Sequence, residues 1–154
     1  MRCWRICRAR WSAQAWDGEG ARLLGGRWNH PGDRMVYAAG SLSLAALETL
    51  VHVEPEIAPA DLVAIPAELP DDLEIERWSA SDLPRDWRSY PAPAQLRDLG
   101  ADWLRSRRTA VLLVPCAVIP EESCLLINPA HPRAAALRPG DARPFSFDPR
   151  LFGA

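Results

Sequence analysis

The sequence predicts a single domain in which a mixed β-sheet is covered by a few helices. The chain has 154 residues, a length typical of one domain that folds on its own. Short apolar or alternating runs typical of strands are separated by stretches with helical periodicity. These elements do not alternate as regularly as in a doubly wound sheet, and no GxGxxG follows a strand, which argues against a Rossmann fold.

Seven segments are predicted to be strands. CWRIC, residues 3–7, alternates, with Trp4 and Ile6 on one face and Arg5 between two cysteines on the other. TAVLLVP, residues 109–115, has the continuous apolar run of a buried central strand. The other predicted strands are residues 35–39, 62–65, 73–78 and 124–128, and RPFSF near the C-terminus is expected to close the sheet.

Helical periodicity is clearest in residues 41–53, where Leu44, Leu47 and Val51 share one face and a serine can cap the start. Residues 95–106 form a second predicted helix, and a short third one is expected within residues 130–137. The glycine-rich stretch from residue 17 to residue 34 has many turn signals and little regular periodicity.

Glu48 lies on the apolar stripe of the first helix, one turn from both Leu44 and Val51. Two interpretations follow from helix geometry, and both stay open at this point. The carboxylate either pairs with a buried arginine or reaches solvent at the rim, or it faces a cleft, where it is held for chemistry or for a polar ligand. A buried carboxylate needs a partner, because burying a lone charge is expensive.

Residues that could line a site with Glu48 stand just upstream. In GGRWN, residues 25–29, two glycines allow a tight turn, Arg27 offers a bidentate fork for phosphate or carboxylate, and Trp28 offers a flat apolar wall. Tyr37 follows in the strand just before the helix. An arginine, an aromatic ring and a carboxylate together suit a nucleotide or a dinucleotide.

Composition excludes several classes of function. The net charge of -2 lacks the basic excess of a nucleic-acid-binding protein. All 18 basic residues are arginine, which excludes Schiff-base chemistry and a phosphate-loop lysine. No apolar run approaches the ~20 residues of a membrane span and no signal core is visible, so a cytoplasmic protein is expected. The four cysteines and three histidines lack ligand spacing, so no metal is expected.

Several segments, taken in order, resemble the RES-domain toxins over essentially the whole chain. These segments are WRI (4–6), GEGARLLGGRWN (18–29), VYAAGSLSLAALETLVH (36–52), LLVPCAVIPEE (112–122), LINPAHP (126–132) and FDPRLF (147–152). The most specific combination is GGRWN followed by VYAA and by an alanine- and leucine-rich helix that carries a glutamate. On this resemblance, residues 1–154 are one RES domain.

The resemblance implies an α+β fold similar to that of ADP-ribosyltransferases, a split mixed sheet with helices around an NAD cleft. It implies a homodimeric toxin of a type II toxin–antitoxin pair, with an Xre-type helix-turn-helix antitoxin as partner and NAD as substrate rather than cofactor. The expected reaction is NAD glycohydrolysis, cleavage of the nicotinamide–ribose bond. The alternatives are ADP-ribosyl transfer to a protein and a catalytically attenuated binding protein; RNA cleavage is disfavoured by the absent basic excess.

Four site residues are carried over by the resemblance. Arg5 and Arg27 are expected to bind the pyrophosphate of NAD, and Tyr37 to stack on or flank the nicotinamide. Glu48 is expected to hydrogen-bond the nicotinamide-side ribose and to stabilise the oxocarbenium-like cation as nicotinamide leaves. Arg5, Tyr37 and Glu48 are therefore the predicted catalytic residues, and the reaction is expected to need no metal.

Two cysteines depart from the family pattern. Cys116 stands where the family usually has an active-site serine, and Cys124 where it usually has an asparagine. A thiol is a weaker hydrogen-bond donor than a hydroxyl, so Cys116 is either a weakened NAD-binding residue or a plain packing residue. Asn128 and His131, in NPAHP, are expected to be turn and capping residues rather than catalysts.

Overall fold

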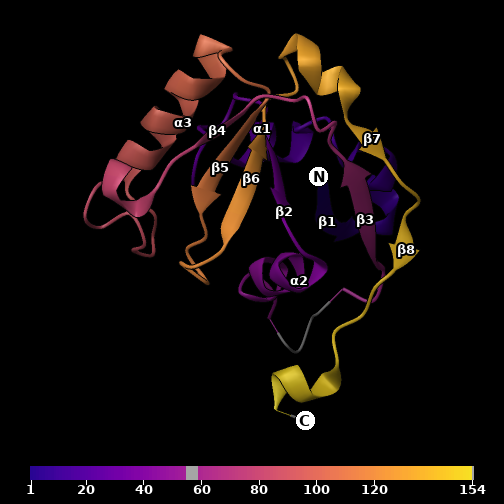
Figure 1. Ribbon diagram of the computed structural model, residues 1–154. Helices are drawn as coiled ribbons and strands as arrows, with labels where there is room; N and C mark the ends of the chain where they lie inside the picture. The colour runs from indigo at the N-terminus through magenta and orange to yellow at the C-terminus, as the bar shows by residue number, and fades with distance from the viewer. Residues whose placement is uncertain (55–58, 154) are drawn as a thin grey trace.

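A mixed sheet of eight strands forms the centre of the computed structural model, which describes residues 1–54 and 59–153 (Figure 1). Along the sheet the order is β4-β5-β6-β2-β1-β3-β7, and β8 also pairs with β3. Among the described strands, β4 and β5 pair in parallel and all other pairs are antiparallel. The strands are β1 (Arg2–Arg8), β2 (Val36–Ala39), β3 (Leu62–Glu68), β4 (Ile75–Arg77), β5 (Val111–Pro115), β6 (Ser123–Ile127), β7 (Arg138–Pro139) and β8 (Arg143–Pro144).

The predicted strands are all confirmed, with shifts of a few residues at their ends. The strand predicted for residues 62–65 continues to Glu68, since the chain stays paired with β1 along its whole length. RPFSF contributes only Arg143–Pro144 as a strand, after which the N–H of Phe145 donates to Leu62 O. The run 109–115 is the buried central strand expected, because every residue of β5 is buried.

Three α-helices accompany the sheet among the described residues: α1 (Glu19–Leu24), α2 (Leu42–Leu50) and α3 (Ala94–Ser106). The short 3-10 segments are η1 (Ala9–Gln14), η3 (Ala80–Asp82), η4 (Pro132–Ala136) and η5 (Pro149–Phe152). The expected helix at 130–137 is thus one of these 3-10 segments. The sequence predicts no regular structure in the glycine-rich stretch, yet this stretch contains α1, which is too short for a 3.6-residue periodicity to show in the sequence.

The apolar face of α2 differs in one respect from the expectation. Ser41 caps the helix, its hydroxyl accepting a hydrogen bond from the N–H of Leu44, and Leu44 and Ala45 are buried. The helix ends at Leu50, so Val51 falls at its C-cap and is 57% exposed. The buried stripe therefore runs through Leu44 and Ala45 to Glu48 and stops short of Val51.

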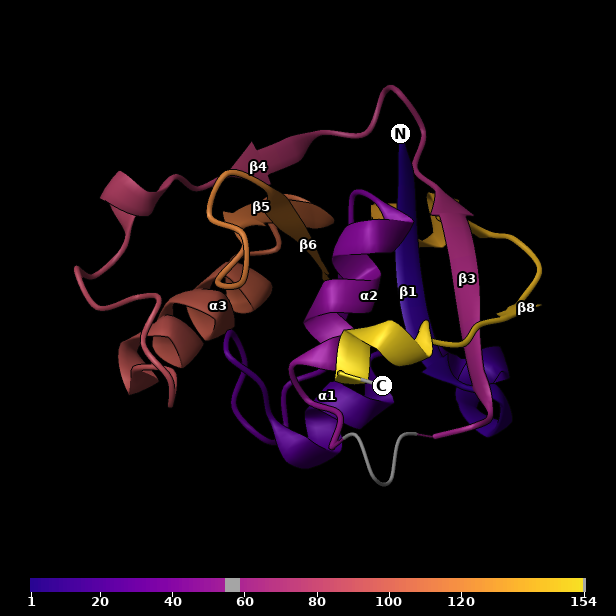
Figure 2. The ribbon, with the colours of Figure 1, turned by 90° about the horizontal axis from the view of Figure 1, so that it is seen from below.

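The sheet is split between β1 and β2. These two strands pair at one register position, Trp4 with Ala39, whereas β1 pairs with β3 along all of its residues. One part of the sheet consists of β4, β5, β6 and β2, and the other of β1, β3, β7 and β8. Helix α2 lies across the split and contacts both β1 and β2, as the two views show (Figures 1 and 2).

The two faces of the sheet carry different parts of the core. One face, with Cys3, packs against Trp16 and Leu137. The other face packs against α3 near β5 and β6, and against α2 near β1 and β2. Side chains of this second face that meet α2 or its neighbours are Trp4, Ile6, Ala39, Cys116 and Cys124. The face that holds Trp4 and Ile6 is thus the face on which Glu48 is presented.

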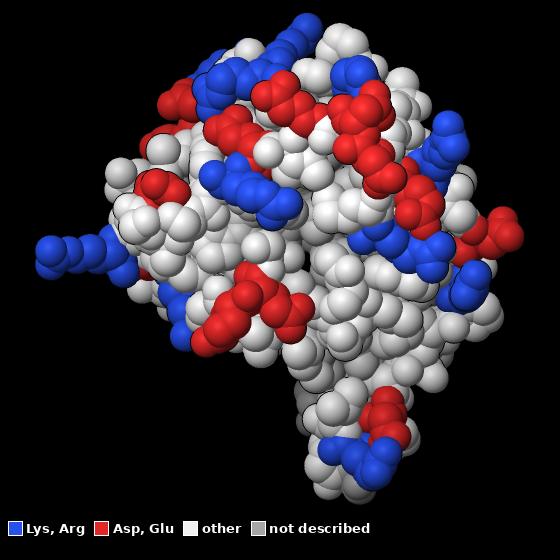
Figure 3. Space-filling view, viewed as in Figure 1, with Lys and Arg blue, Asp and Glu red and all other residues white. Residues whose placement is uncertain are grey.

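Charged side chains of both signs are interspersed on the face seen in Figure 3, without a uniformly basic area in that view. Within the described residues, none of the helices has the length and apolar character needed to cross a membrane.

Helix α3 approaches the GGRWN loop so closely that a side chain at Gly100 has no room. A Cβ atom built there would lie 1.9 Å from the backbone oxygen of Trp28. We expect Gly100→Ala to lower the free energy of unfolding by about 3 kcal/mol, the upper end of the usual cost of overpacking. Urea denaturation followed by circular dichroism measures this loss.

Gly20→Ala is the matched control, because Gly20 lies in α1 with no heavy atom within 4 Å of the position that a Cβ would take. Alanine has the higher helix propensity, so this variant should be unchanged or more stable by up to about 1 kcal/mol. Equal stability of the two variants would contradict the tight contact between α3 and the loop.

Candidate active site

Glu48 is positioned by the local sequence of α2. The cap at Ser41 starts the helix directly after β2, and the burial of Leu44 and Ala45 fixes which side of the helix faces the sheet. Glu48 follows these two residues at spacings of four and three, so its half-buried side chain points the same way. The carboxylate is therefore held on the inner face of the helix, at the split in the sheet.

Two thiols are the hydrogen-bond partners of this carboxylate. Glu48 Oε1 accepts from Cys116 Sγ at 2.8 Å and from Cys124 Sγ at 3.3 Å. Cys116 follows the end of β5, its side chain is buried with only 1% exposed, and its sulfur also accepts from the N–H of Ile119 at 3.1 Å. No arginine or histidine pairs with Glu48 in residues 1–54 and 59–153.

The thiol pair is electrostatically unequal. The pKa of Cys124 is raised, first by its hydrogen bond with Cys116 and then by burial and by the Glu48 charge. The same sulfur–sulfur hydrogen bond lowers the pKa of Cys116, while burial and the Glu48 carboxylate act in the opposite direction. Cys124 thus keeps its proton at neutral pH. Because thiols are weak donors, the charge of Glu48 is only weakly compensated.

Arg5 reaches into the split from β1. Its Nη1 donates to the backbone oxygen of Tyr37 at 2.6 Å, just beyond the point where β1 and β2 stop pairing. Its Nε is buried and has no hydrogen-bond partner among the described residues. Burial lowers the pKa of the guanidinium, an effect that the nearby Cys7 and Asp17 partly offset. A buried donor without a partner is available to a ligand anion.

Arg5 and Glu48 are not brought into direct contact. Strand alternation puts Arg5 on the face opposite to Trp4 and Ile6, and those two residues lie on the side of α2. Only the opening between β1 and β2 lets the guanidinium approach Tyr37. The two predicted residues therefore reach the split from opposite faces of the sheet.

Tyr37 is tied to the GGRWN loop through its hydroxyl group. The hydroxyl donates to Asn29 Oδ1 at 2.7 Å and accepts from the N–H of Trp28 at 3.0 Å. Burial raises its pKa, so the phenol stays neutral. A Cβ at Gly26 would lie 2.5 Å from this hydroxyl, which explains one of the two glycines in the motif. Both hydrogen bonds of the Tyr37 hydroxyl are thus made within the protein.

Arg27 belongs to the GGRWN loop that binds the Tyr37 hydroxyl, and Arg97 contacts the same loop from α3. Arg27 donates to the backbone oxygens of Trp87 at 2.8 Å and Ser89 at 3.2 Å. Arg97, on α3, donates to Gly26 O at 3.0 Å. The charges of Arg97, Arg27 and Arg5 all act to lower the pKa of Tyr37, against the larger effect of burial. Arg27 and Arg97 thus meet at the loop that holds the Tyr37 hydroxyl, whereas Arg5 lies on the opposite face of the sheet and contacts the backbone oxygen of Tyr37.

Arg97 and Asn29 were missed by the sequence analysis. Asn29 is fully buried and its amide donates to the backbone oxygens of Ala21, His30 and Asp33, so it holds the loop together. Its place in GGRWN was a usable signal. For Arg97 the sequence contained no such signal. An arginine on the polar face of a predicted helix cannot be distinguished, from the sequence alone, from an ordinary solvent-exposed charge.

Asn128 and His131 have the structural roles expected for them. The Asn128 amide donates to Leu104 O, and its Oδ1 accepts from the N–H of Ala130. His131 caps η4, its Nδ1 accepting from the N–H of Arg133.

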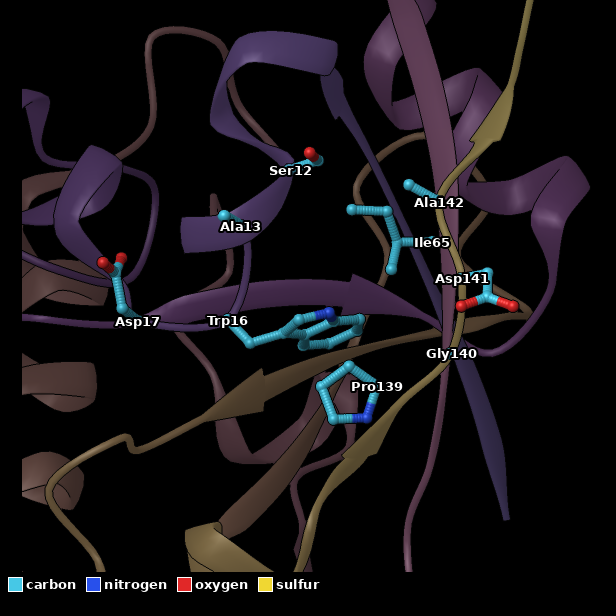
Figure 4. A pocket seen from close by; sticks show the side chains of 9 residues that line it. All are labelled: Ser12, Ala13, Trp16, Asp17, Ile65, Pro139, Gly140, Asp141 and Ala142. Carbon is cyan, nitrogen blue, oxygen red and sulfur yellow. The ribbon is translucent and has the colours of Figure 1, made fainter.

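A separate hollow of about 450 Å³ lies on the face of the sheet away from α2. Figure 4 shows Trp16 and Ile65 facing the segment 139–142 across it. None of the predicted site residues lines this hollow. The arrangement around Glu48 and Tyr37 is therefore a different place in the fold.

The sequence is similar to proteins of one family along almost its whole length. A model of the RES domain matches residues 2–148. A protein named Toxin Res, from Yersinia enterocolitica serotype O:8 / biotype 1B, is 41% identical over 152 residues, which cover 98% of this chain and 99% of that protein. The chain belongs to the RES-domain family of toxins.

Two further comparisons bear on this RES-domain chain. A protein named Prs ADP-ribosylating toxin, from Sphingobium sp. (strain YBL2), is 41% identical over 152 residues, covering 96% of this chain and 94% of that protein. A chain in the crystal structure of the M. tuberculosis MbcT-MbcA toxin-antitoxin complex superposes with a TM-score of 0.76 at 20% identity, covering 99% of this chain and 86% of that chain. The predicted α+β fold of the ADP-ribosyltransferase-like class is confirmed.

The two hydrogen bonds of the Tyr37 hydroxyl give a test of this loop architecture. Tyr37→Phe removes the donor to Asn29 and the acceptor for the Trp28 N–H, and leaves these buried groups unsatisfied. We expect a loss of about 1–3 kcal/mol in the free energy of unfolding, measured by denaturant titration. Tyr90→Phe is the matched control, because Tyr90 is 85% exposed; a loss as large in this variant would contradict the assignment.

Proposed function

We propose that this RES-domain chain consumes NAD by breaking the bond between nicotinamide and ribose, with Glu48 as the catalytic carboxylate. One observation carries the proposal. Glu48 is half-buried at the split in the sheet, accepts hydrogen bonds from two thiols, and has no cationic partner among the described residues. A carboxylate that is not neutralised by an arginine keeps its charge for a cation that forms only during the reaction.

The reaction that suits this carboxylate is loss of nicotinamide from the ribose C1′. The C1′–N bond breaks, its electron pair goes to the nicotinamide nitrogen, and neutral nicotinamide leaves. Glu48 stabilises the resulting oxocarbenium-like ribose and hydrogen-bonds a ribose hydroxyl. Water then adds to C1′ and loses a proton, which completes hydrolysis to ADP-ribose.

Arg5 and Arg27 are proposed to hold the pyrophosphate. The unpartnered Nε of Arg5 is a charge-assisted donor at the split that α2 crosses. Arg27 uses one nitrogen for Trp87 and Ser89, so its other N–H groups can bind a phosphate. Tyr37 would flank the nicotinamide with its ring, because its hydroxyl is committed to the loop.

ADP-ribosyl transfer to a protein is the second candidate. It is favoured by the 41% identical relative that is named a Prs ADP-ribosylating toxin. Both candidates share the same first bond cleavage and differ in whether water or a protein nucleophile attacks C1′. NAD labelled in its ADP-ribose part separates them, since hydrolysis leaves the label free and transfer leaves it on protein.

A catalytically attenuated binding protein is the third candidate. It rests on the contact of Cys116 with Glu48, where a weak thiol donor stands in the position of the usual serine. Such a chain would retain the pocket for recognition and release nicotinamide slowly or not at all.

An antitoxin partner follows from the likeness to a toxin-antitoxin complex and from the relatives named Toxin Res. We propose that this partner is of the Xre helix-turn-helix type and that the chain forms a homodimer. Co-purification with the antitoxin and the mass of the free chain in solution test these two statements.

The role of Glu48 is tested by nicotinamide release from NAD. We expect Glu48→Gln to lower the rate at least about 100-fold, because the neutral amide cannot stabilise the ribosyl cation. The amide has nearly the same shape as the carboxylate, so the fold should be retained, which circular dichroism checks.

Glu121→Gln is the control, since Glu121 is exposed and its substitution removes the same charge elsewhere. This variant should keep the parent rate. A Glu48→Gln variant that is folded and as fast as Glu121→Gln would rule out the catalytic role of Glu48.

Cys116→Ser tests the attenuated alternative. A hydroxyl is a stronger donor than a thiol, so we expect the variant to orient Glu48 better and to release nicotinamide several-fold faster than the parent. An unchanged rate, at unchanged stability, would show that Cys116 is a packing residue with no effect on catalysis.

A further inference from the structure

Three groups that commonly bind metal ions meet at Glu48. One carboxylate oxygen of Glu48 and the sulfurs of Cys116 and Cys124 all lie within 4.8 Å of one another. They come from α2, from the residue after β5 and from β6, segments that the split sheet brings together. The two cysteines are 68 and 76 residues from Glu48, which is why ligand spacing in the sequence did not reveal the group.

We propose that Glu48, Cys116 and Cys124 form a binding site for a thiophilic divalent cation, Zn²⁺ in the first place. Zinc takes thiolate and carboxylate ligands in tetrahedral geometry, and an accessible zinc site commonly has three protein ligands and one open position. The three side chains supply such a set, and water would fill the fourth position.

The observed distances need only small adjustments to accept the ion. Zn–S bonds of about 2.3 Å and Zn–O bonds of about 2.0–2.2 Å place tetrahedral ligand atoms roughly 3.5–3.8 Å apart. Cys116 Sγ and Cys124 Sγ lie 2.8 Å and 3.3 Å from Glu48 Oε1. Side-chain rotations that move these atoms apart by up to about 1 Å would therefore open the site.

The surroundings of Cys116 favour a metal-bound thiolate. The sulfur is buried and accepts a hydrogen bond from the N–H of Ile119, the type of outer contact that orients a ligand and stabilises its charge. Two thiolates and one carboxylate carry three negative charges, which a divalent cation largely neutralises. Each thiol loses a proton when the ion binds, so affinity rises with pH.

Binding of the ion would inhibit NAD consumption, a consequence that rests on the function proposed above for Glu48. A carboxylate oxygen bonded to Zn²⁺ no longer offers its negative charge to the ribosyl cation. The ion also occupies the space next to that carboxylate. Zinc is therefore expected to switch the enzyme off rather than to serve as its cofactor.

Cobalt titration tests the site directly and does not depend on NAD. Reduced protein under anaerobic conditions is titrated with Co²⁺, and thiolate-to-cobalt charge-transfer absorption is recorded in the near ultraviolet. We expect one Co²⁺ per chain, displaced by one equivalent of Zn²⁺. Cys116→Ser and Cys124→Ser should each lose the charge-transfer band or weaken binding at least about 10-fold.

Cys7→Ser is the matched control, because it removes a thiol on the other face of the sheet, away from α2. It should titrate like the parent, and circular dichroism confirms that all variants are folded. No band in the parent, or a band that keeps its intensity and affinity in both Cys116→Ser and Cys124→Ser, overturns the proposed site.

Nicotinamide release in the presence of Zn²⁺ tests the inhibition. The parent and Cys7→Ser should lose most of their activity at one equivalent of Zn²⁺ and regain it with a chelator, whereas Cys124→Ser should be at least about 10-fold less sensitive. If zinc binds and turnover continues unchanged, the inhibitory role is wrong. If no variant releases nicotinamide, the proposed function fails, while the cobalt result still decides the metal site.

Discussion

The parting of β1 from β2 after one paired position is the constraint on which the rest of the structure depends. Antiparallel strands usually pair along their length, because each backbone N–H and C=O needs a partner. Here the Arg5 side chain, rather than a backbone N–H of the neighbouring strand, donates to the backbone oxygen of Tyr37. The opening that results is spanned by α2, and this is how a helix residue, Glu48, comes to lie at the middle of a sheet.

The site is built from polar groups that the fold leaves incompletely satisfied. Within the part of the chain that the structure describes, Arg5 keeps a buried Nε without a partner, and Glu48 accepts hydrogen bonds only from two thiols. Each unmade or weak hydrogen bond of this kind costs about 1–3 kcal/mol in a buried setting. Such groups favour the binding of a ligand that supplies the missing hydrogen bonds. Incompletely satisfied polar groups of this kind are common at functional sites.

GGRWN combines a structural and a binding role within five residues. Asn29 and the backbone of Trp28 hold the Tyr37 hydroxyl, and Gly26 leaves room for it. Arg27 alone among these residues reaches outward, to the loop at Trp87 and Ser89. A motif that suggests ligand contacts in the sequence thus acts mainly by fixing the position of a neighbouring tyrosine.

The sequence by itself determined most of the strands, the helices α2 and α3, and the orientation of Glu48. Strand alternation put Arg5 opposite to Trp4 and Ile6, and helical spacing with the cap near Ser41 put Glu48 on the inner face of its helix. These are properties of a few consecutive residues, because backbone geometry sets a period of two in strands and about 3.6 in helices.

Only the tertiary structure decided which side chains meet. The thiols of Cys116 and Cys124 became partners of Glu48 because β6 lies between β5 and β2, so that segments far apart in the chain are adjacent in space. Arg97 contacts Gly26 in the GGRWN loop because Gly100 lets α3 approach that loop. Such convergence depends on strand order and on the closeness of packed elements, and local periodicity carries no information about either.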